Sequence, residues 1–255
     1  MYNSIQDTLI IGKKVIYLPS CHSTNDIAAE IVHAGLFTEG TVVITDNQLK
    51  GRGQRGTTWV ANPGENLTFS IILTPEFLPV SDQFLISQIT ALAIRSYVHN
   101  YIENVRVKWP NDILANKKKI CGILIENGIQ GMKLKSSVIG IGLNVNQLDF
   151  KEDRATSLSL ETGVPFALPD EFQKLLGFLD KYYVRLRQKS FNQAIRAEYL
   201  SQLHGYGKEL EFIYENKARR GTIAYVSSEG LLGLNLSDQD EVLELGLKQI
   251  QWLIN

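Results

Sequence analysis

Residues Gly51 to Gly56 read GRGQRG, which places two arginines among three glycines. The planar guanidinium group of arginine can donate two parallel hydrogen bonds to a carboxylate or phosphate, and glycine lets the backbone approach an anion closely. The same six residues satisfy the G-x-G-x-x-G fingerprint of a dinucleotide-binding turn. On this stretch alone, a flexible hairpin tip with two exposed arginines is slightly favoured, so the choice depends on the flanking sequence.

The sequence around this loop argues against a dinucleotide-binding unit. A strand-like run, TVVITDNQ, precedes the loop, and Glu76 follows at the distance of a ribose-binding acid. However, the turn residues Asn62-Pro63-Gly64 come soon after Gly56, and the next strand begins near Asn66. A helical crossover between parallel strands needs about a dozen residues or more. We therefore predict an antiparallel return between the two strands.

Three further segments put polar residues into strand-like surroundings. In VKWPND, Lys108 stands at a strand end where it could offer a cation to a ligand, although an outward residue on a half-exposed strand is commoner. In KICGILIE, Lys119 precedes an apolar run containing Gly122, and a glycine within a strand often marks close approach of a ligand or backbone. In IGIGLNVN, Asn144 is polar in a buried-looking run and needs a partner, either the backbone or a ligand.

The composition bounds the class of protein. A chain of 255 residues can form one large domain, or a large and a small one, and its 44% hydrophobic and 21% charged content is typical of globular proteins. The formal net charge of -1 provides no strong field for nucleic acid, and no apolar run approaches the length of a membrane span. No signal peptide is evident, and Cys21 and Cys121 show neither metal-ligand nor disulfide spacing. We therefore expect a cytoplasmic protein with reduced thiols.

Hydrophobic periodicity predicts mixed strands and helices followed by a small all-β module. The STND segment from Ser23 to Asp26 resembles a capping box that opens the first helix, and ANKKK is typical of a turn. From Gly205 onward, short strands alternate with glycine and polar turns, so we divide the chain into domains 1–204 and 205–255. Predicted strands cover residues 14–18, 41–45, 67–73, 105–109, 119–126 and 134–145, and predicted helices cover 24–34, 81–102, 170–187 and 191–201.

The segments STND, GRGQRGTTW, VKWPNDI, KKICGILIE and IGIGLNVN, in this order, resemble the signature segments of biotin protein ligases. The resemblance continues into ATSL and ETG, between Ala155 and Gly163, and covers nearly the whole chain. Each motif alone is modest, but five in order are highly specific. The resemblance implies an α/β (α+β) fold of the class II synthetase and biotin–lipoate ligase type. That fold has a mixed, largely antiparallel sheet with helices on one side, plus a small C-terminal SH3-like β-barrel.

The resemblance also implies a two-step reaction. Biotin, as substrate, and ATP with Mg²⁺ would give biotinoyl-AMP and pyrophosphate, and a lysine of a biotin carboxyl carrier domain of a carboxylase would then take the biotinoyl group. Because the nucleophile belongs to the partner, the enzyme must supply positioning and charge stabilisation rather than a Ser-His-Asp or Cys-His set. The enzyme would be a monomer or homodimer, would bind neither DNA nor membranes, and would use its C-terminal module for nucleotide or carrier binding.

Matching motifs carry the family's functional residues onto this chain. The catalytic residues would be Arg52 and Lys108. The biotin-binding residues would be Ser23, Thr24, Asn25, Gln48, Gly51, Arg52, Gly53, Gln54, Lys108 and Gly122. The nucleotide-binding residues would be Arg52, Arg55, Trp59, Asn111, Lys119 and Asn144, and Asp112 would contribute to Mg²⁺ binding. Gln54 stands where some family members have arginine, so we do not expect position 54 to neutralise phosphate.

Two alternatives compete with this interpretation. A lipoate-protein ligase or octanoyl transferase would share the catalytic fold, but such enzymes are expected to carry an SGGG-type loop followed by His-Asp, which differs from GRGQRG. A biotin-responsive repressor would need a helix-turn-helix domain before the catalytic core. The first predicted strand begins near Lys14, which leaves too little sequence for such a domain, so we expect no repressor role.

Overall fold

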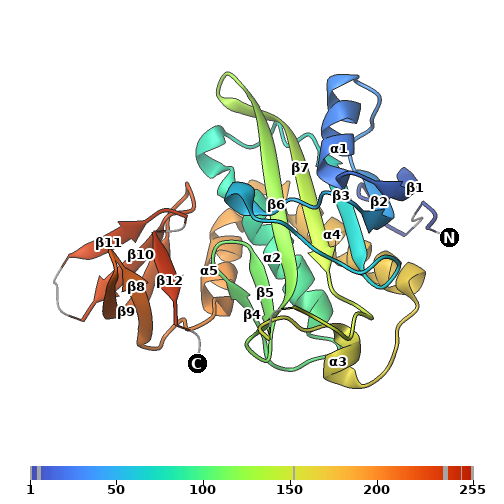
Figure 1. Ribbon diagram of the computed structural model, residues 1–255. Coiled ribbons are helices and arrows are strands. Elements are labelled where there is room, and N and C mark those ends of the chain that lie inside the picture. The colour runs from blue at the N-terminus through green and yellow to red at the C-terminus, as the bar shows by residue number, and fades with distance from the viewer. Residues whose placement is uncertain (1, 5–6, 152, 238–240, 248, 254–255) are drawn as a thin grey trace.

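Among the residues that the structure describes, seven strands form a mixed sheet in the order β1-β2-β3-β7-β6-β5-β4 (Figure 1). The structure is a computed structural model and describes residues 2–4, 7–151, 153–237, 241–247 and 249–253. β1 and β2 pair in parallel, and the other neighbours pair antiparallel, which confirms the predicted sheet. The strands are β1 (Val15–Cys21), β2 (Thr41–Gln48), β3 (Leu67–Leu73), β4 (Val105–Lys108), β5 (Asp112–Ala115), β6 (Lys118–Gln130) and β7 (Lys133–Leu143).

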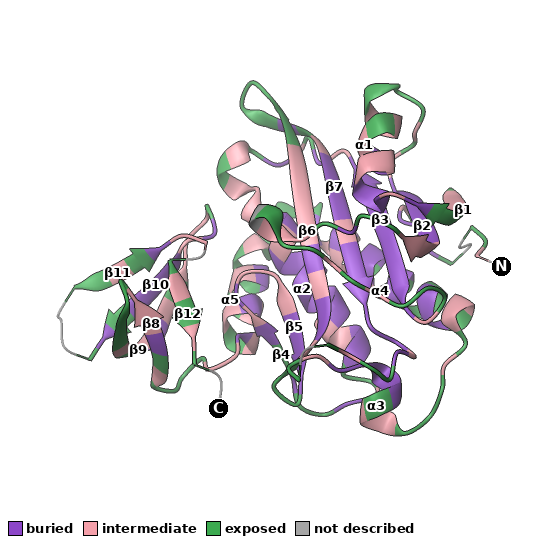
Figure 2. Ribbon diagram, viewed as in Figure 1, coloured by how far each residue is buried: buried purple, intermediate pink, exposed green. Residues whose placement is uncertain are grey.

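The return from β2 to β3 is antiparallel, as the short connection predicts. Thr41 pairs with Ile72, and Thr45 pairs with Thr68. Every residue of β3 is buried, and Figure 2 shows that this strand and much of β7 lie inside the protein. The glycine-arginine loop therefore connects two antiparallel neighbours and does not open a crossover helix, which rules out the dinucleotide-binding arrangement.

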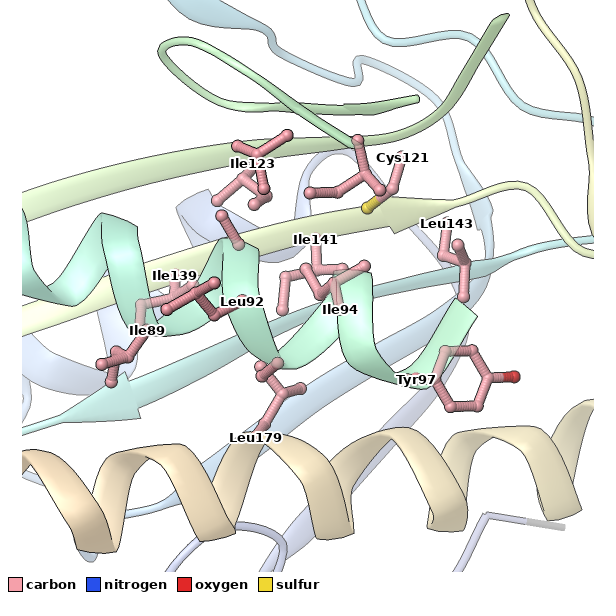
Figure 3. Close-up of a cluster of buried hydrophobic side chains, with 14 of the residues drawn as sticks. Ile89, Leu92, Ile94, Tyr97, Cys121, Ile123, Ile139, Ile141, Leu143 and Leu179 are labelled. Carbon is pink, nitrogen blue, oxygen red and sulfur yellow. The ribbon is translucent and has the colours of Figure 1, made fainter. Parts of the chain in front are cut away.

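Helices cover both faces of this sheet. α2 (Phe84–Val98) and α4 (Leu168–Leu186) lie on one face, where Leu92 and Ile141 belong to the main core (Figure 3). α1 (Thr24–His33) packs on the opposite face, in a separate apolar cluster that contains Ala28, Val43, Ile72 and Val138. The prediction of helices on one side holds for α2 and α4 but is wrong for α1. On that opposite face the sheet is apolar at Val43, Ile72 and Val138, and α1 covers these side chains.

The hairpin between β4 and β6 differs from the sequence-based expectation. Trp109, Pro110 and Asn111 turn the chain from β4 into the antiparallel strand β5, which pairs with both β4 and β6 and is absent from the predicted strands. A second reversal, between β5 and β6, lies at Asn116 and Lys117, whose positive φ angles of 47° and 68° suit the predicted ANKKK turn. The remaining helices are α3 (Leu158–Thr162), which is too short to leave a periodic pattern, α5 (Asn192–Gln202), and the 3-10 turns Gln54–Gly56, Val80–Asp82 and Lys189–Phe191.

A second, antiparallel sheet follows α5, in the order β11-β10-β9-β8-β12. In Figure 1 it lies beside the β4–β5 edge of the larger sheet, and Figure 2 shows that it is more exposed. Within the described ranges, β11 and β12 are unpaired edge strands, so the predicted β module is present while its closure into a barrel stays a prediction. Its strands are β8 (Leu210–Tyr214), β9 (Lys217–Val226), β10 (Leu232–Leu236), β11 (Val242–Leu245) and β12 (Ile250–Trp252).

Two further expectations concern the helices and the thiols. No helix in the described part of the chain is both long and apolar enough to cross a membrane. Cys21 and Cys121 are buried and free, and their burial raises the pKa of both thiols. Both groups therefore remain protonated and chemically quiet near neutral pH.

Asp180 of α4 holds the segment that precedes β1. Its carboxylate accepts hydrogen bonds from the backbone N–H groups of Leu9, Ile10 and Ile11 at 2.7, 2.8 and 2.8 Å. Asp180 is only 5% exposed. Since a buried N–H group needs an acceptor, one carboxylate secures the N-terminal segment against α4.

We predict that Asp180→Ala lowers the free energy of unfolding by about 1–3 kcal/mol, because backbone donors lose their shared acceptor. Urea denaturation followed by circular dichroism measures this change. Asp149→Ala is a matched control at an exposed position and should change stability by less than about 0.5 kcal/mol. Equal stabilities of the two variants would contradict the role assigned to Asp180.

Candidate active site

Small residues on β6, β7 and β3 form the floor of a cavity, on the sheet face that also carries α1. Two cross-strand rows make this floor: Gly122–Gly142–Thr68 and Leu124–Gly140–Ser70. A Cβ atom on Gly142 would lie 2.3 Å from the Trp59 ring, and one on Gly140 would lie 2.3 Å from Asn25 Oδ1. Glycine is therefore required at both positions by the close approach of another side chain.

The first turn of α1 supplies polar groups above this floor. The Ser23 hydroxyl caps the helix, as the STND segment predicts. The backbone N–H and the hydroxyl of Thr24 both donate to Gln48 Oε1, at 2.8 and 3.3 Å. Ser70 Oγ lies 2.8 Å from Thr24 Oγ1 and donates to Asn25 Oδ1 at 2.6 Å. These buried groups hold one another in place and can orient a neutral polar ligand.

The GRGQRG loop forms a small hairpin beside the floor. Arg52 and Thr58 make an antiparallel bridge, Gln54–Gly56 forms a 3-10 turn, and Trp59 N donates to Gly51 O at 3.0 Å. The indole ring of Trp59 then packs on the floor glycines. Its Nε1 is buried and has no hydrogen-bond partner among the described protein atoms, so it is a donor that a ligand could satisfy.

Arg52 is held by two carboxylates from different elements. Its Nη1 and Nη2 donate to Glu126 Oε1 and Oε2 at 3.0 and 2.8 Å, and Nη2 lies 2.7 Å from Asp26 Oδ1. Hydrogen bonding to Glu126 raises the pKa of the guanidinium group. Asn25 Nδ2 fixes Glu126 in turn, at 2.8 Å from Oε2. Arg52 therefore ties the loop to α1 and β6, and contact with a ligand anion requires it to exchange at least one carboxylate.

The ends of β4, β5 and β6 bring two lysines to one carboxylate. Lys119 Nζ lies 2.7 Å from Asp112 Oδ1, and Lys108 Nζ lies 3.8 Å from Asp112 Oδ2. Lys108 reaches this position because it pairs with Asp112 across the β4–β5 ladder. Lys119 Nζ also lies 5.5 Å from the centroid of the Trp59 ring. Two ammonium groups and one carboxylate leave a net charge of +1, which favours a further anion.

These elements surround one cavity of about 340 Å³. Its wall combines buried hydroxyl and amide groups with three cations, of which Arg52 lies near α1 and the two lysines lie together at Asp112. The predicted site residues that line it are Ser23, Thr24, Asn25, Gln48, Arg52, Gly53, Gln54, Trp59, Lys108, Asn111, Asp112, Lys119 and Gly122. The structure thus brings together residues from six separate segments, while their roles toward a ligand stay predictions.

Three predicted site residues are not among the described residues that line this cavity. Gly51 lies behind the wall, where a Cβ atom would meet Trp59 O at 2.3 Å, so it allows the loop to pack. Asn144 is 3% exposed and donates to Thr156 O at 2.9 Å, while its Oδ1 is buried without a partner in the described ranges. The side chain of Arg55 lies outside the described part of the chain.

Sequence reasoning missed residues of three kinds. Gly140 and Gly142 could have been found from the sequence, because residues two apart share one face of a strand and two glycines there leave that face without side chains. The acids Asp26 and Glu126 had no signal, since only the fold brings them to Arg52. The apolar wall from the C-terminal sheet had none either, and it consists of Leu247, Ile250 and Trp252.

Comparisons with known proteins extend these observations. A model of the Biotin/lipoate A/B protein ligase family matches residues 17–144. The Bifunctional ligase/repressor BirA of Bacillus subtilis (strain 168) is 32% identical over 240 residues, which cover 91% of this chain and 72% of that protein. A Biotin--[acetyl-CoA-carboxylase] ligase of Mycobacterium tuberculosis is 30% identical over 182 residues, covering 69% of this chain and 66% of that protein.

Solved structures show the same architecture. A biotin protein ligase from Aquifex aeolicus, in complex with biotin and ATP, superposes with a TM-score of 0.76 at 25% sequence identity. The match covers 94% of this chain and 98% of that chain, so it includes both sheets.

We predict that Gly142→Ala displaces the Trp59 ring from the floor, because the new Cβ would lie 2.3 Å from Cε2 of the indole. The fluorescence of Trp59, isolated by subtracting the spectrum of the matching Trp59→Phe variant, should shift to longer wavelength as the ring meets water. Gly177→Ala on α4 is the control, since its Cβ would meet nothing within 4 Å. An unshifted spectrum for Gly142→Ala would disprove the packing.

Proposed function

The chain belongs to the biotin/lipoate A/B protein ligase family, and we propose that it activates biotin with ATP as biotinoyl-AMP and transfers the biotinoyl group to a lysine of a biotin carboxyl carrier domain. The observation that supports this most is the convergence of Arg52, Lys108 and Lys119 on one cavity that also has a polar, neutral part. A carboxylate and a triphosphate repel each other, so a site that joins them needs such cations.

In the first step, a carboxylate oxygen of biotin forms a bond to the α-phosphorus of ATP. The bond from that phosphorus to the oxygen bridging the β-phosphate breaks, and pyrophosphate leaves with the electron pair. Lys108 and Lys119 offset the negative charge that gathers on the phosphate oxygens, and Asp112 keeps the two ammonium groups oriented. Ser23, Thr24 and Gln48 offer hydrogen bonds to the ureido ring of biotin.

We assign Mg²⁺ to this step as a companion of the nucleotide. The described residues contain no group of three or more His, Cys, Asp or Glu side chains that could hold a metal by themselves. Mg²⁺ usually keeps several waters and is bound by substrate phosphates with one or two carboxylates. Asp112 is the acidic residue among the described residues that line the cavity, so it could supply the protein carboxylate for such an ion. The ion would neutralise phosphate charge when bound.

In the second step, the ε-amino group of the carrier lysine attacks the acyl carbon of biotinoyl-AMP. A carbon–nitrogen bond forms, the bond from the acyl carbon to the phosphate oxygen breaks, and AMP leaves with the electron pair. The lysine ammonium loses two protons to water over the whole step, one before the attack and one as the amide forms. The enzyme contributes position and charge, and needs no nucleophile of its own.

The remaining proposals concern substrate and setting. The named relatives and solved structures above are biotin ligases, which favours biotin over lipoate or octanoate. The wall from Leu247, Ile250 and Trp252 supports a role of the C-terminal sheet in nucleotide or carrier binding. We further propose the division into domains 1–204 and 205–255, a monomer or homodimer, and a cytoplasmic setting that suits two free thiols.

Biotin-dependent exchange of labelled pyrophosphate into ATP tests the proposed function directly. We expect exchange with biotin and no inhibition by lipoate at equal concentration. Exchange that depends on lipoate instead of biotin would establish the competing activity, and exchange with neither would refute adenylate formation. A gel shift with biotin-operon promoter DNA tests the repressor role, for which we expect no retarded band.

We predict that Lys108→Ala slows biotin-dependent pyrophosphate exchange about 100- to 1,000-fold while the protein stays folded. Removal of one contact that stabilises charge in the transition state has this order of effect. Lys118→Ala is the control, because Lys118 is exposed on the same hairpin and does not line the cavity. Near-normal exchange by folded Lys108→Ala protein would exclude the proposed role.

We predict that Arg52→Gly releases biotinoyl-AMP before the carrier lysine attacks it. This variant loses the contacts of Arg52 to α1 and β6, so the loop no longer shields the reactive anhydride from water. Incubation with biotin, ATP and serum albumin, followed by detection of biotin on albumin, measures the release. Lys50→Gly removes an exposed cation next to the loop and serves as control. Equal labelling by wild type and Arg52→Gly would disprove retention by the loop.

A further inference from the structure

A second cavity, of about 230 Å³, adjoins the candidate active site. The two cavities share part of their walls, formed by Gln54, Pro110, Asn111, Ile123 and Leu247. A ligand group in the second cavity would therefore lie next to a ligand in the first.

The second cavity lies where the two sheets of the protein meet. α2 contributes Phe84, β6 contributes Ile125 and Asn127, and the turn Glu229–Leu231 of the C-terminal sheet closes the other side. Trp109 Nε1 donates to Gly230 O at 3.0 Å, and a Cβ atom on Gly230 would lie 2.4 Å from the Phe84 ring. These contacts fix the turn, so the position of Glu229 is set by packing between the sheets.

The charges that line the two cavities are opposite. The main cavity has Arg52, Lys108 and Lys119 against one acid, Asp112. Among the described lining residues of the second cavity, Glu229 is the one charged side chain, and it is exposed. Asn127 donates to Gln83 at 3.0 Å and Asn111 donates to Ile123 O at 2.7 Å, so amide groups of this wall are already paired.

The carboxylate of Glu229 is available to a cation. Hydrogen bonds from its own backbone N–H and from Ser228 and Ser227 lower its pKa, so it is ionised at neutral pH. Arg196, whose charge acts on it, already pairs with Asp82 at 2.6 Å. Glu229 thus places a negative charge beside a cavity whose other described lining side chains are neutral.

The reaction proposed above brings two anions and one cation to the enzyme. The anions are the biotin carboxylate and the triphosphate, which suit the main cavity, and the cation is the ammonium group of the accepting lysine. We infer that the second cavity is the binding site for this lysine side chain, with Glu229 attracting the ammonium group and Phe84, Ile125 and Leu247 packing along its four-carbon stem. This inference rests on the proposed function and adds no chemical step to it.

Glu229→Gln separates this inference from the first half of the reaction. Pyrophosphate exchange needs no lysine, so the variant should retain the wild-type exchange rate. Transfer of biotin to an isolated biotin carboxyl carrier domain should show a KM for the carrier raised about two- to fivefold, as expected for loss of one exposed charge pair. Glu229→Lys, which reverses the charge, should raise this KM further, and added salt should reduce both differences.

Glu241→Gln is the matched control, because Glu241 is an exposed glutamate directly before β11 and does not line the cavity. It should leave both half-reactions unchanged. Wild-type KM for the carrier in both Glu229 variants would overturn the inference, and so would a raised KM for ATP or biotin in the exchange reaction, which would make the cavity part of the first-step site. Failure of wild-type exchange would refute the proposed function itself, independently of Glu229.

Discussion

The direct pairing of Gly122 with Gly142 across β6 and β7 is the constraint on which the site depends. Two residues without side chains leave room on the sheet for the indole ring of Trp59. Side chains are normally present on both faces of a central strand, so such a gap in a buried sheet is stabilised only if another group fills it. Trp59 fills part of it, and the remaining space becomes a cavity between the loop, α1 and the sheet.

Electrostatics then divides this cavity into regions with different chemistry. Arg52 is balanced by Asp26 and Glu126, whereas Lys108 and Lys119 share the single carboxylate of Asp112. One guanidinium with two carboxylates carries a net charge of -1, and the lysine pair with Asp112 carries +1. A ligand anion is therefore attracted first to the two lysines. Arg52 can contact the same anion only if it releases one of the two carboxylates that already bind the guanidinium group.

The C-terminal sheet completes the site instead of standing apart from it. The bond from Trp109 Nε1 to Gly230 O joins the end of β4, next to Lys108, to a turn of the smaller sheet. Because Leu247 lines both cavities, residues from both parts of the chain form the walls of each cavity. A displacement of the smaller sheet would therefore change the walls of both cavities.

The sequence by itself determined the local elements and the identity of the chemical groups. The short, turn-rich connection after Gly56 required an antiparallel return, and STND specified the start of α1, because turns and caps depend on neighbouring residues. The ordered motifs pointed to the family and to Lys108, Lys119 and Arg52. Tertiary structure alone decided the second face covered by α1, the acids that hold Arg52, and the wall from Leu247 and Trp252. These contacts join residues far apart in the chain, such as Arg52 and Glu126, and their geometry follows from sheet register and packing, which local sequence patterns do not encode.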